Sequence, residues 1–206
     1  MFRRFLIATI VLLASASFLQ AGKYNPVLSI GDKAPAWKDL RGIDGKRHSL
    51  SDLEDAVAIV LVFTCNSCPY AIDYEERVIA LTKTFSGRKV SVVAVNVNKI
   101  PEDNFEAMQK RAKSQGFNFT YLFDETQQIA KDYGATYTPE FFVLDRQRKI
   151  AYMGALDDSP DANKVKVHHV AKTLSALLMN KQPKLTETIA IGCRIRIERA
   201  RRSKPK

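Results

Sequence analysis

Two long apolar runs constrain the fold of this chain more than any other feature. They are Ala56–Phe63 (AVAIVLVF) and Val90–Val97 (VSVVAVNV), and both are rich in β-branched residues. Runs of this length and composition are typical of strands that are covered on both faces of a sheet. Between them, apolar residues recur at spacings of three and four and stop before Gly87, which predicts a helix. A strand, a helix and a second buried strand in this order indicate a βαβ unit.

The remaining segments extend this unit into one α/β domain. The Asp44-Gly45 pair predicts a turn between two short strands, at about 37–40 and 46–50. We therefore expect a central mixed β-sheet flanked by helices, with an N-terminal hairpin extension. The other elements that we expect are helices at about 101–115, 126–133 and 165–179 and strands at 121–123, 140–144 and 150–153.

The N-terminus has the pattern of a secretory signal peptide over residues 1–21. Arg3 and Arg4 precede the apolar run Phe5–Leu19, and small residues follow up to Ala21. The run is shorter than the roughly 20 residues that a membrane-spanning helix needs. We expect an exported protein, periplasmic or extracellular, in a compartment where cysteines can be oxidised. An uncleaved signal would instead tether the domain to the membrane.

The net charge of +10 is concentrated at the ends of the chain. Residues 193–206 carry seven basic residues against one acidic residue, and Arg3 and Arg4 add two charges, so that +2 remains for the rest. This distribution predicts a domain over residues 22–182 and a basic tail over 183–206. No aromatic residue interleaves the arginines of the tail to stack on bases, so we expect no nucleic-acid partner.

A Cys-x-x-Cys pair, Cys65 and Cys68, lies at the junction between the first apolar run and the first helix. This spacing allows a disulfide that opens and closes without refolding the domain. The N-terminus of a helix carries a partial positive charge of about half a unit, and cysteines placed there titrate at about 3.5 to 7.5 instead of about 8.5. The pair therefore predicts a reactive thiolate.

Pro69 leaves two helix registers open. If the helix begins near Cys65, Pro69 lies within its first turn and kinks it. If the helix begins at Pro69, Cys68 becomes the capping residue. The first register makes Cys65 the nucleophile and Cys68 the resolving thiol. The second register makes Cys68 the nucleophile. We expect the first, because the attacking member of such a pair is generally the more exposed one.

Two other uses of the cysteine pair fit the sequence less well. A structural disulfide across so small a loop would remove little entropy from the unfolded state. A zinc site would need two further ligands, and the remaining Cys193, His48, His168 and His169 form no second pair at the required spacing. The three histidines are expected at the surface. We therefore expect no metal and no bound cofactor.

Two more features bear on the chemistry. Thr138-Pro139 directly precedes the predicted strand at 140–144, and a proline there is either an ordinary first residue or a built turn with a cis bond. Beyond the last helix, Cys193 is either an unpaired thiol on the tail or a third redox cysteine that folds back onto the site or bridges two chains. The neighbouring Arg194 and Arg196 would favour its thiolate.

With these features together, the chain resembles the thioredoxin-like superfamily, in particular its redoxin branch of alkyl-hydroperoxide-reductase-type and thiol-disulfide proteins. The similarity covers about residues 31–179, through the opening Gly-Asp-x-Ala-Pro, the stretch 44–53, the Cys-x-x-Cys and the Thr-Pro. The resemblance implies that Cys65 attacks a disulfide and Cys68 resolves the mixed disulfide. It also implies that the loop at Pro139 is a cis-proline loop that holds the partner chain, with Thr138 offering backbone groups to it.

The resemblance implies an enzyme, a thiol-disulfide oxidoreductase that acts on a protein or small-molecule disulfide or thiol and needs a separate, unidentified electron donor. The uncharged Asn66-Ser67 between the cysteines predicts a potential of roughly −270 to −180 mV. Two departures leave alternatives open. Thr64 replaces the tryptophan that commonly precedes the first cysteine of thioredoxins, and the Pro-x-x-x-Thr-x-x-Cys arrangement of peroxiredoxins is absent. The alternatives are a peroxiredoxin-like thiol peroxidase and a non-catalytic binding module on the same fold.

Overall fold

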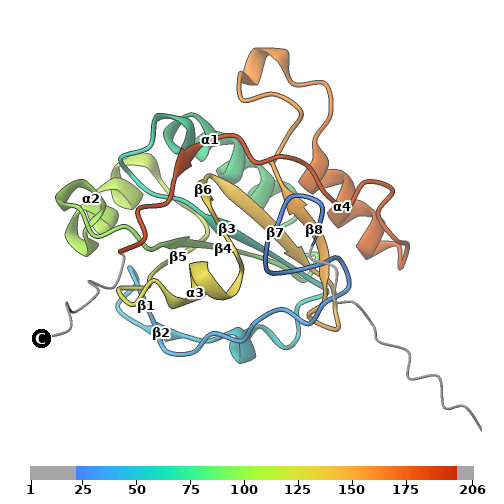
Figure 1. Ribbon diagram of the computed structural model, residues 1–206, viewed down its shortest axis with the longest axis horizontal. Helices are drawn as coiled ribbons and strands as arrows, with labels where there is room; N and C mark the ends of the chain where they lie inside the picture. Colours follow the sequence, from blue (N-terminus) through green and yellow to red (C-terminus); the bar gives the residue numbers. More distant parts are fainter. Residues whose placement is uncertain (1–21, 199–206) are drawn as a thin grey trace, which may run out of the picture.

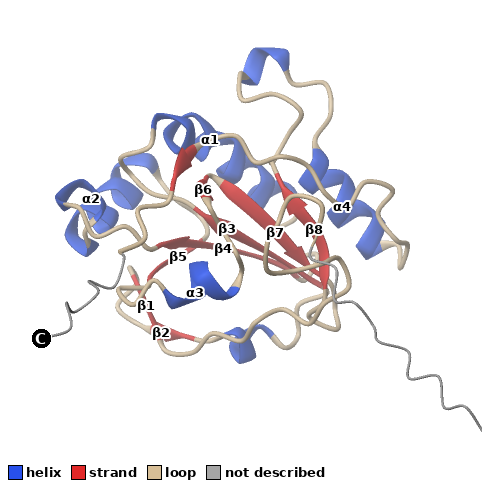
Figure 2. Ribbon diagram, in the orientation of Figure 1, coloured by secondary structure: helices blue, strands red, loops and turns tan. Residues whose placement is uncertain are grey.

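The computed structural model of the chain describes residues 22–198, which form a central sheet with helices on both faces (Figures 1 and 2). The predicted signal peptide, 1–21, and the last eight residues of the predicted tail, 199–206, lie outside the described residues. No helix within 22–198 is long and apolar enough to cross a membrane.

The central sheet has seven strands in the order β2-β1-β5-β4-β3-β7-β8. The pairs β3–β4 and β4–β5 are parallel, and the outer pairs are antiparallel, so the sheet is mixed as predicted. A second, two-stranded sheet joins β6 to β9. The strands are β1 Leu40–Gly42, β2 Arg47–His48, β3 Ala58–Phe63, β4 Val90–Asn96, β5 Thr120–Phe123, β6 Tyr137–Thr138, β7 Glu140–Leu144, β8 Ile150–Gly154 and β9 Cys193–Arg194.

Within residues 22–198, four α-helices cover the two faces of the central sheet. They are α1 Pro69–Thr84, α2 Phe105–Gln115, α3 Gln128–Asp132 and α4 His169–Leu178. Three short 3₁₀ helices, Leu50–Leu53, Pro101–Asp103 and Ala162–Lys164, lie in the connections.

The central strand β3 explains why the chain needs two helical layers. All six of its residues are buried, and alternate side chains point to opposite faces. Val60 and Val62 pack in one cluster with residues of α1, α2 and α4, whereas Leu61 and Phe63 pack in the other with residues of α3 and the N-terminal segment. The continuous apolar pattern of this run is therefore the signature of a strand covered on both sides, as predicted.

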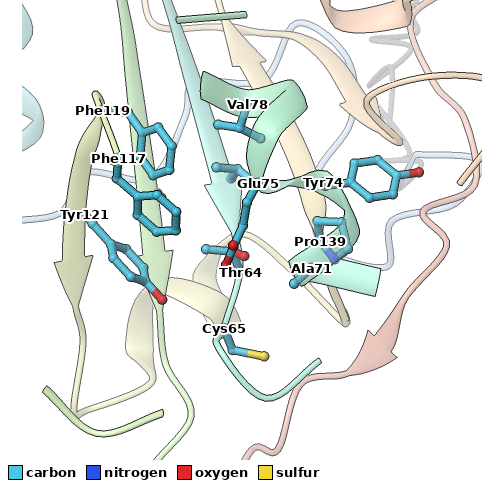
Figure 3. A pocket seen from close by; sticks show the side chains of 12 residues that line it. Thr64, Cys65, Ala71, Tyr74, Glu75, Val78, Phe117, Phe119, Tyr121 and Pro139 are labelled. Carbon is cyan, nitrogen blue, oxygen red and sulfur yellow. The ribbon is translucent and has the colours of Figure 1, made fainter. Parts of the chain in front are cut away.

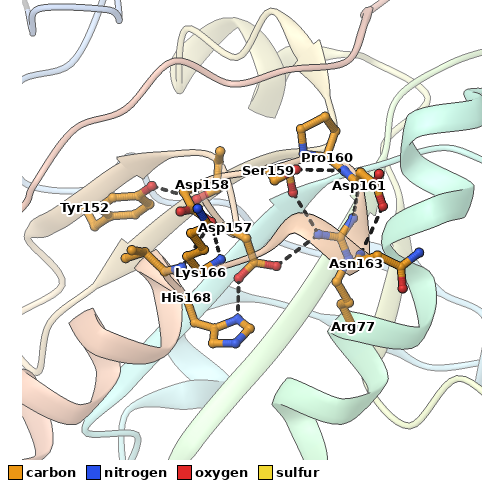
Figure 4. A network of polar contacts seen from close by, with 12 residues as sticks. Arg77, Tyr152, Asp157, Asp158, Ser159, Pro160, Asp161, Asn163, Lys166 and His168 are labelled. Atoms are coloured by element: carbon orange, nitrogen blue, oxygen red, sulfur yellow. Dashed lines mark hydrogen bonds and ion pairs between the residues drawn. The ribbon is translucent and has the colours of Figure 1, made fainter.

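The last helix begins later than predicted, at His169 instead of about 165. Two aspartates hold the preceding residues in an extended conformation (Figure 4). Asp158 accepts hydrogen bonds from the backbone N–H groups of Lys166 and Val167, and the buried Asp157 lies 2.7 Å from Nδ1 of His168. These bonds compete with the first turn that the sequence pattern favoured.

Candidate active site

The first long helix begins at Pro69, and Cys68 is its N-cap, with an extended backbone (φ −86°, ψ 118°). The expectation that this helix begins near Cys65 is therefore wrong. Proline is well suited to the first helical position, because the N–H that it lacks would have no partner there. The positive end of the α1 dipole accordingly faces Cys68, the second cysteine of the pair.

The structure brings the predicted site residues together. Sγ of Cys65 lies 3.5 Å from Oγ1 of Thr138, and Sγ of Cys68 lies 3.0 Å from the carbonyl oxygen of the same residue. The Thr138–Pro139 bond is cis, one of the two conformations that the sequence left open. Cys193 packs against the cluster that these two cysteines form with Ala71. Cys65 and Cys68 are each only 2% exposed, so exposure does not distinguish them.

The two thiols share one proton unequally. The pKa of Cys68 is lowered to about 4, mainly because the Cys65 thiol donates a hydrogen bond to its sulfur, with contributions from Cys193 and the backbone N–H of Ala71. The pKa of Cys65 is raised, first by this same hydrogen bond and then by burial, and the charge of Asp103 acts in the same direction. The thiolate therefore belongs on Cys68 and the proton on Cys65.

One contact opposes a thiolate on Cys68. The carbonyl oxygen of Thr138, 3.0 Å from Sγ, can only accept a hydrogen bond and so favours the protonated thiol. Against it stand the donors Cys65, Cys193 and Ala71 and the N-terminus of α1. Several donors and a helix N-terminus outweigh one carbonyl, so the pKa of Cys68 is lowered despite this contact.

A buried carboxylate, Asp103, fixes the loop between the cysteines. It is 0% exposed and accepts hydrogen bonds from the backbone N–H groups of Asn66 and Ser67, both at 2.8 Å. It also accepts from the Ser67 hydroxyl at 2.7 Å and the Asn98 amide at 3.0 Å. The sequence analysis missed this residue, because the Pro-Glu-Asp run reads as the start of a helix. That helix in fact begins at Phe105, after Asn104 caps it.

Glu140 has a similar role in the cis-proline loop. Its side chain is buried and accepts hydrogen bonds from the backbone N–H groups of Thr136 (2.8 Å) and Tyr137 (2.9 Å). Burial raises the pKa of this carboxyl. Its only signal in the sequence is a charged residue at the start of a predicted buried strand.

A pocket opens beside Cys65 between β3, β5 and α1 (Figure 3). Phe117, Phe119 and Tyr121 form one wall, and the Glu75 carboxylate points in from α1. Arg111 pairs with that carboxylate through two hydrogen bonds of 2.7 and 2.9 Å, which balances its charge. The pocket therefore offers an apolar surface next to the thiol.

The described residues contain no group of three or more His, Cys, Asp or Glu side chains that could hold a metal ion. His48 lies in β2 beside Asp44, and His168 contacts Asp157 at the start of α4. His168 is exposed, as predicted for all three histidines, whereas His48 and His169 are partly buried.

Residues 30–153 match the model of the AhpC/TSA family. The chain belongs to the AhpC/TSA family. Two solved structures cover most of this AhpC/TSA chain, each with a TM-score of 0.80: a hypothetical protein from Sinorhizobium meliloti 1021 (30% identity, 85% of this chain and 98% of that one) and an uncharacterized conserved protein from Geobacillus kaustophilus (35% identity, 85% and 96%).

A third structure, a putative thiol:disulfide interchange protein DsbE from Chlorobium tepidum, is similar over a smaller part of the chain. It has 28% identity and a TM-score of 0.54, and the match covers 61% of this chain and 84% of that one. No curated protein sequence matches the chain. Together with the seven-stranded mixed sheet, these similarities establish the thioredoxin-like fold that the sequence predicted.

Proposed function

We propose that this AhpC/TSA protein is a thiol-disulfide oxidoreductase whose redox centre is the Cys65–Cys68 pair. The observation that carries the proposal is the packing of Cys65 and Cys68 together at the N-terminus of α1, with both sulfurs against Thr138 (3.5 Å from its Oγ1 and 3.0 Å from its carbonyl oxygen) beside cis-Pro139. Two thiols in contact can close into a disulfide, and one of them carries a thiolate at neutral pH.

The proposed reaction transfers two electrons to a disulfide substrate. The Cys68 thiolate attacks one sulfur of the substrate, an S–S bond forms to Cys68, and the other substrate sulfur leaves as a thiolate. The Cys65 thiol then attacks Sγ of Cys68. This step forms the Cys65–Cys68 disulfide, releases the second substrate thiol and passes the Cys65 proton to it. A separate dithiol reductant would return the enzyme to its reduced form.

This assignment exchanges the roles that the sequence predicted for the two cysteines. Cys65 was expected to attack because it should lie at the helix N-terminus and be the more exposed thiol. The helix instead begins after Cys68, and both side chains are 2% exposed. Cys68 therefore takes the attacking role in the proposal, and Thr138 with Pro139 keeps its predicted place beside the reacting sulfurs.

We also propose that the protein works in an exported compartment. The charged start and apolar run of residues 1–21 are the basis for this. A periplasmic or extracellular location suits a reversible disulfide, because such compartments allow it to persist.

Trapping a mixed disulfide with glutathione tests both the reaction class and the roles. The reduced protein is mixed with oxidised glutathione, quenched in acid and weighed by mass spectrometry. Wild type should form an internal disulfide. In a Cys193→Ser background, Cys65→Ser should hold glutathione on Cys68, and Cys68→Ser should react on Cys65 at least about 100-fold more slowly, because its thiolate fraction is far smaller.

Two results of this experiment would count against the proposal in different ways. Faster capture by the Cys68→Ser variant would restore the roles predicted from the sequence. Failure of every variant and of wild type to react faster than free glutathione would remove the reaction class itself.

A thiol peroxidase is the second candidate, and one observation favours it: a thiolate on Cys68 lies at a helix N-terminus with proline at the next position. A peroxide would oxidise this thiolate to a sulfenic acid, which Cys65 could condense to a disulfide with loss of water. Stopped-flow mixing with hydrogen peroxide separates the two. We expect a rate no faster than that of a free thiolate, because the Pro-x-x-x-Thr-x-x-Cys arrangement is absent.

A further inference from the structure

Residues 186–198, which we call the strap, follow α4 in the chain and cross the molecule towards α1 and β6 (Figure 1). The strap is fixed at its upstream end on β8. The backbone N–H of Thr188 donates to the Met153 carbonyl at 3.0 Å, and the Thr188 hydroxyl lies 2.6 Å from the hydroxyl of Tyr152. This part of the predicted basic tail is thus packed on the domain.

The strap is fixed again downstream of Cys193. Ile195 donates its backbone N–H to the Thr136 carbonyl at 2.9 Å, and its side chain is 8% exposed within the core. The carbonyl of Arg196 accepts from the buried Gln127 amide at 2.9 Å, and the backbone N–H of Glu198 donates back to the Gln127 side chain at 2.8 Å. Cys193 is therefore held between two anchored segments.

Between its anchors the strap pairs with the strand that precedes the cis-proline. In the antiparallel β6–β9 pair, Thr138 lies opposite Cys193 and Tyr137 opposite Arg194. Gly192 approaches the cis-proline loop so closely that a Cβ there would lie 2.6 Å from the carbonyl carbon of Thr138 and 3.0 Å from the nitrogen of Pro139. Only glycine allows this approach, which places the strap in direct contact with the cis-proline loop of the redox centre.

This pairing directs the third thiol at one sulfur in particular. Cys193 packs against the cluster of Cys65, Cys68 and Ala71, opposite Thr138, whose carbonyl oxygen lies 3.0 Å from Sγ of Cys68. Contact with Cys68 is among the causes that set the pKa of Cys193, and contact with Cys193 is among those that set the pKa of Cys68. Cys68 thus has two thiol neighbours, Cys65 and Cys193.

We propose that Cys193 is a third redox residue of this site, whose thiol exchanges into the Cys65–Cys68 disulfide of the oxidised protein to form a Cys68–Cys193 disulfide and free the Cys65 thiol. The inference rests on the proposed function, because it needs the Cys65–Cys68 disulfide as its starting point. Sγ of Cys193 attacks Sγ of Cys68, the Cys65–Cys68 bond breaks, and the proton of Cys193 passes to the departing Cys65 sulfur. One S–S bond forms and one breaks, so no oxidant or reductant is consumed.

The charge of the Cys68 sulfur affects the pKa of Cys193, and this charge is lost when the first disulfide forms. In the reduced protein the pKa of Cys193 is raised to about 11, first by burial and then by contact with Cys68, so its thiol acts as a donor and not as a nucleophile. Once Cys68 is in a disulfide its negative charge is gone, and Arg196, which favours the Cys193 thiolate, is no longer opposed by it. Formation of the first disulfide therefore removes the contribution of Cys68 to the raised pKa of Cys193, while the contribution of burial remains.

The Cys68–Cys193 disulfide would also decide which chain occupies the edge of β6. An extended partner can add to an exposed strand edge through backbone hydrogen bonds. In this structure β9 already takes that edge, and the cross-link would lock it there. A protein partner then has access to β6 only while Cys193 is reduced.

Peptide mapping tests the exchange, because the cysteines fall on different tryptic peptides. Cys65 and Cys68 lie on residues 48–77 and Cys193 on residues 185–194. The protein is equilibrated in a glutathione redox buffer, quenched with acid and alkylated, and digested. We expect the cross-linked pair of peptides in roughly a third or more of the oxidised wild type, as for an exchange near balance. Cys65→Ser should retain the cross-link, and Cys68→Ser should lose it.

Gly192→Ala tests whether the placement of the strap causes the exchange, since it keeps all three thiols. Its Cβ would meet the Thr138–Pro139 backbone, so we expect the cross-link to fall at least about fivefold while the Cys65–Cys68 disulfide persists. Ile189→Ala, on a 61% exposed side chain of the same strap, is the matched control and should leave the yield unchanged.

The outcomes separate the two proposals. An internal disulfide confined to residues 48–77 in wild type, with less than about 5% cross-link, would overturn the exchange and leave the proposed function standing. No internal disulfide of either kind would overturn the proposed function. An unchanged cross-link yield in a folded Gly192→Ala variant would also overturn the exchange as argued here, because the strap would not be what positions Cys193.

Discussion

The ultraviolet absorbance of the reduced protein is expected to show one thiolate that persists from neutral pH down to about pH 5, because the pKa of Cys68 is lowered to about 4. Because its pKa is lowered, the Cys68 sulfur stays negatively charged until the pH falls through that pKa. At pH 6 an ordinary cysteine, with a pKa near 8.5, is roughly 0.3% thiolate, so the expected difference is about 300-fold. The measurement is an absorbance titration of the reduced protein.

Single substitutions of the cysteines show which sulfur carries the thiolate that absorbs. Cys68→Ser should abolish the acidic thiolate. Cys193→Ser should leave most of it, because Cys193 is a thiol in this pH range. Cys65→Ala removes the largest cause of the lowered pKa and should move the midpoint up by about one unit or more. A wild-type midpoint near that of free cysteine would show that the start of α1 does not activate Cys68.

The parts of the fold that the sequence predicted are those with local causes. Each residue of β3 packs against one of two helical layers, so the run is apolar throughout and is recognisable without its neighbours. The Cys-x-x-Cys spacing itself places two thiols within reach. The helix register was not decided, because Pro69 is compatible with a kink after Cys65 and with a first helical position after Cys68. Only the backbone hydrogen bonds of the folded helix distinguish these two registers.

The residues that the sequence analysis missed have partners far along the chain. Asp103 binds the cysteine loop 36 residues away, and no local pattern announces that contact. The strap did carry a signal: Ile191, Cys193, Ile195 and Ile197 alternate with other residues, which is typical of an extended segment. The surrounding arginines drew attention to charge instead. The number of charges in a segment indicates how it interacts with solvent and with charged partners. It does not indicate whether the backbone of that segment is hydrogen-bonded to the domain.

Asp103→Asn is expected to have the largest effect on stability of any single polar substitution at this site. The carboxylate accepts four hydrogen bonds while fully buried. An asparagine has the same shape but keeps only one acceptor oxygen. Its amide NH₂ group would face groups that donate hydrogen bonds to the carboxylate of Asp103. We expect a loss of about 2–4 kcal/mol in the free energy of unfolding, since bonds to a charged group contribute about 1.5–3 kcal/mol each and are not additive. Denaturant unfolding measures it.

Glu102→Gln is the matched control, because it makes the same change of charge at the adjacent, exposed position. Only the backbone carbonyl of Glu102 contacts the loop, through the Asn66 amide at 3.0 Å, and the substitution leaves that bond in place. A change of less than about 0.5 kcal/mol is expected there. Equal effects at the two positions would mean that charge alone, and not the four bonds of Asp103, stabilises the loop.

The same variant distinguishes positioning of the loop from activation of the thiolate. Asp103 is among the causes that raise the pKa of Cys65 but not among those that set the pKa of Cys68. Asp103→Asn should therefore lower the stability and the pKa of Cys65 while the acidic thiolate of Cys68 stays where it is. Loss of that thiolate in the folded variant would mean that the loop, and not the start of α1 with its thiol donors, holds the charge. The reactivity of the pair would then depend on the buried carboxylate, and the assignment of the attacking role to Cys68 would lose its electrostatic basis.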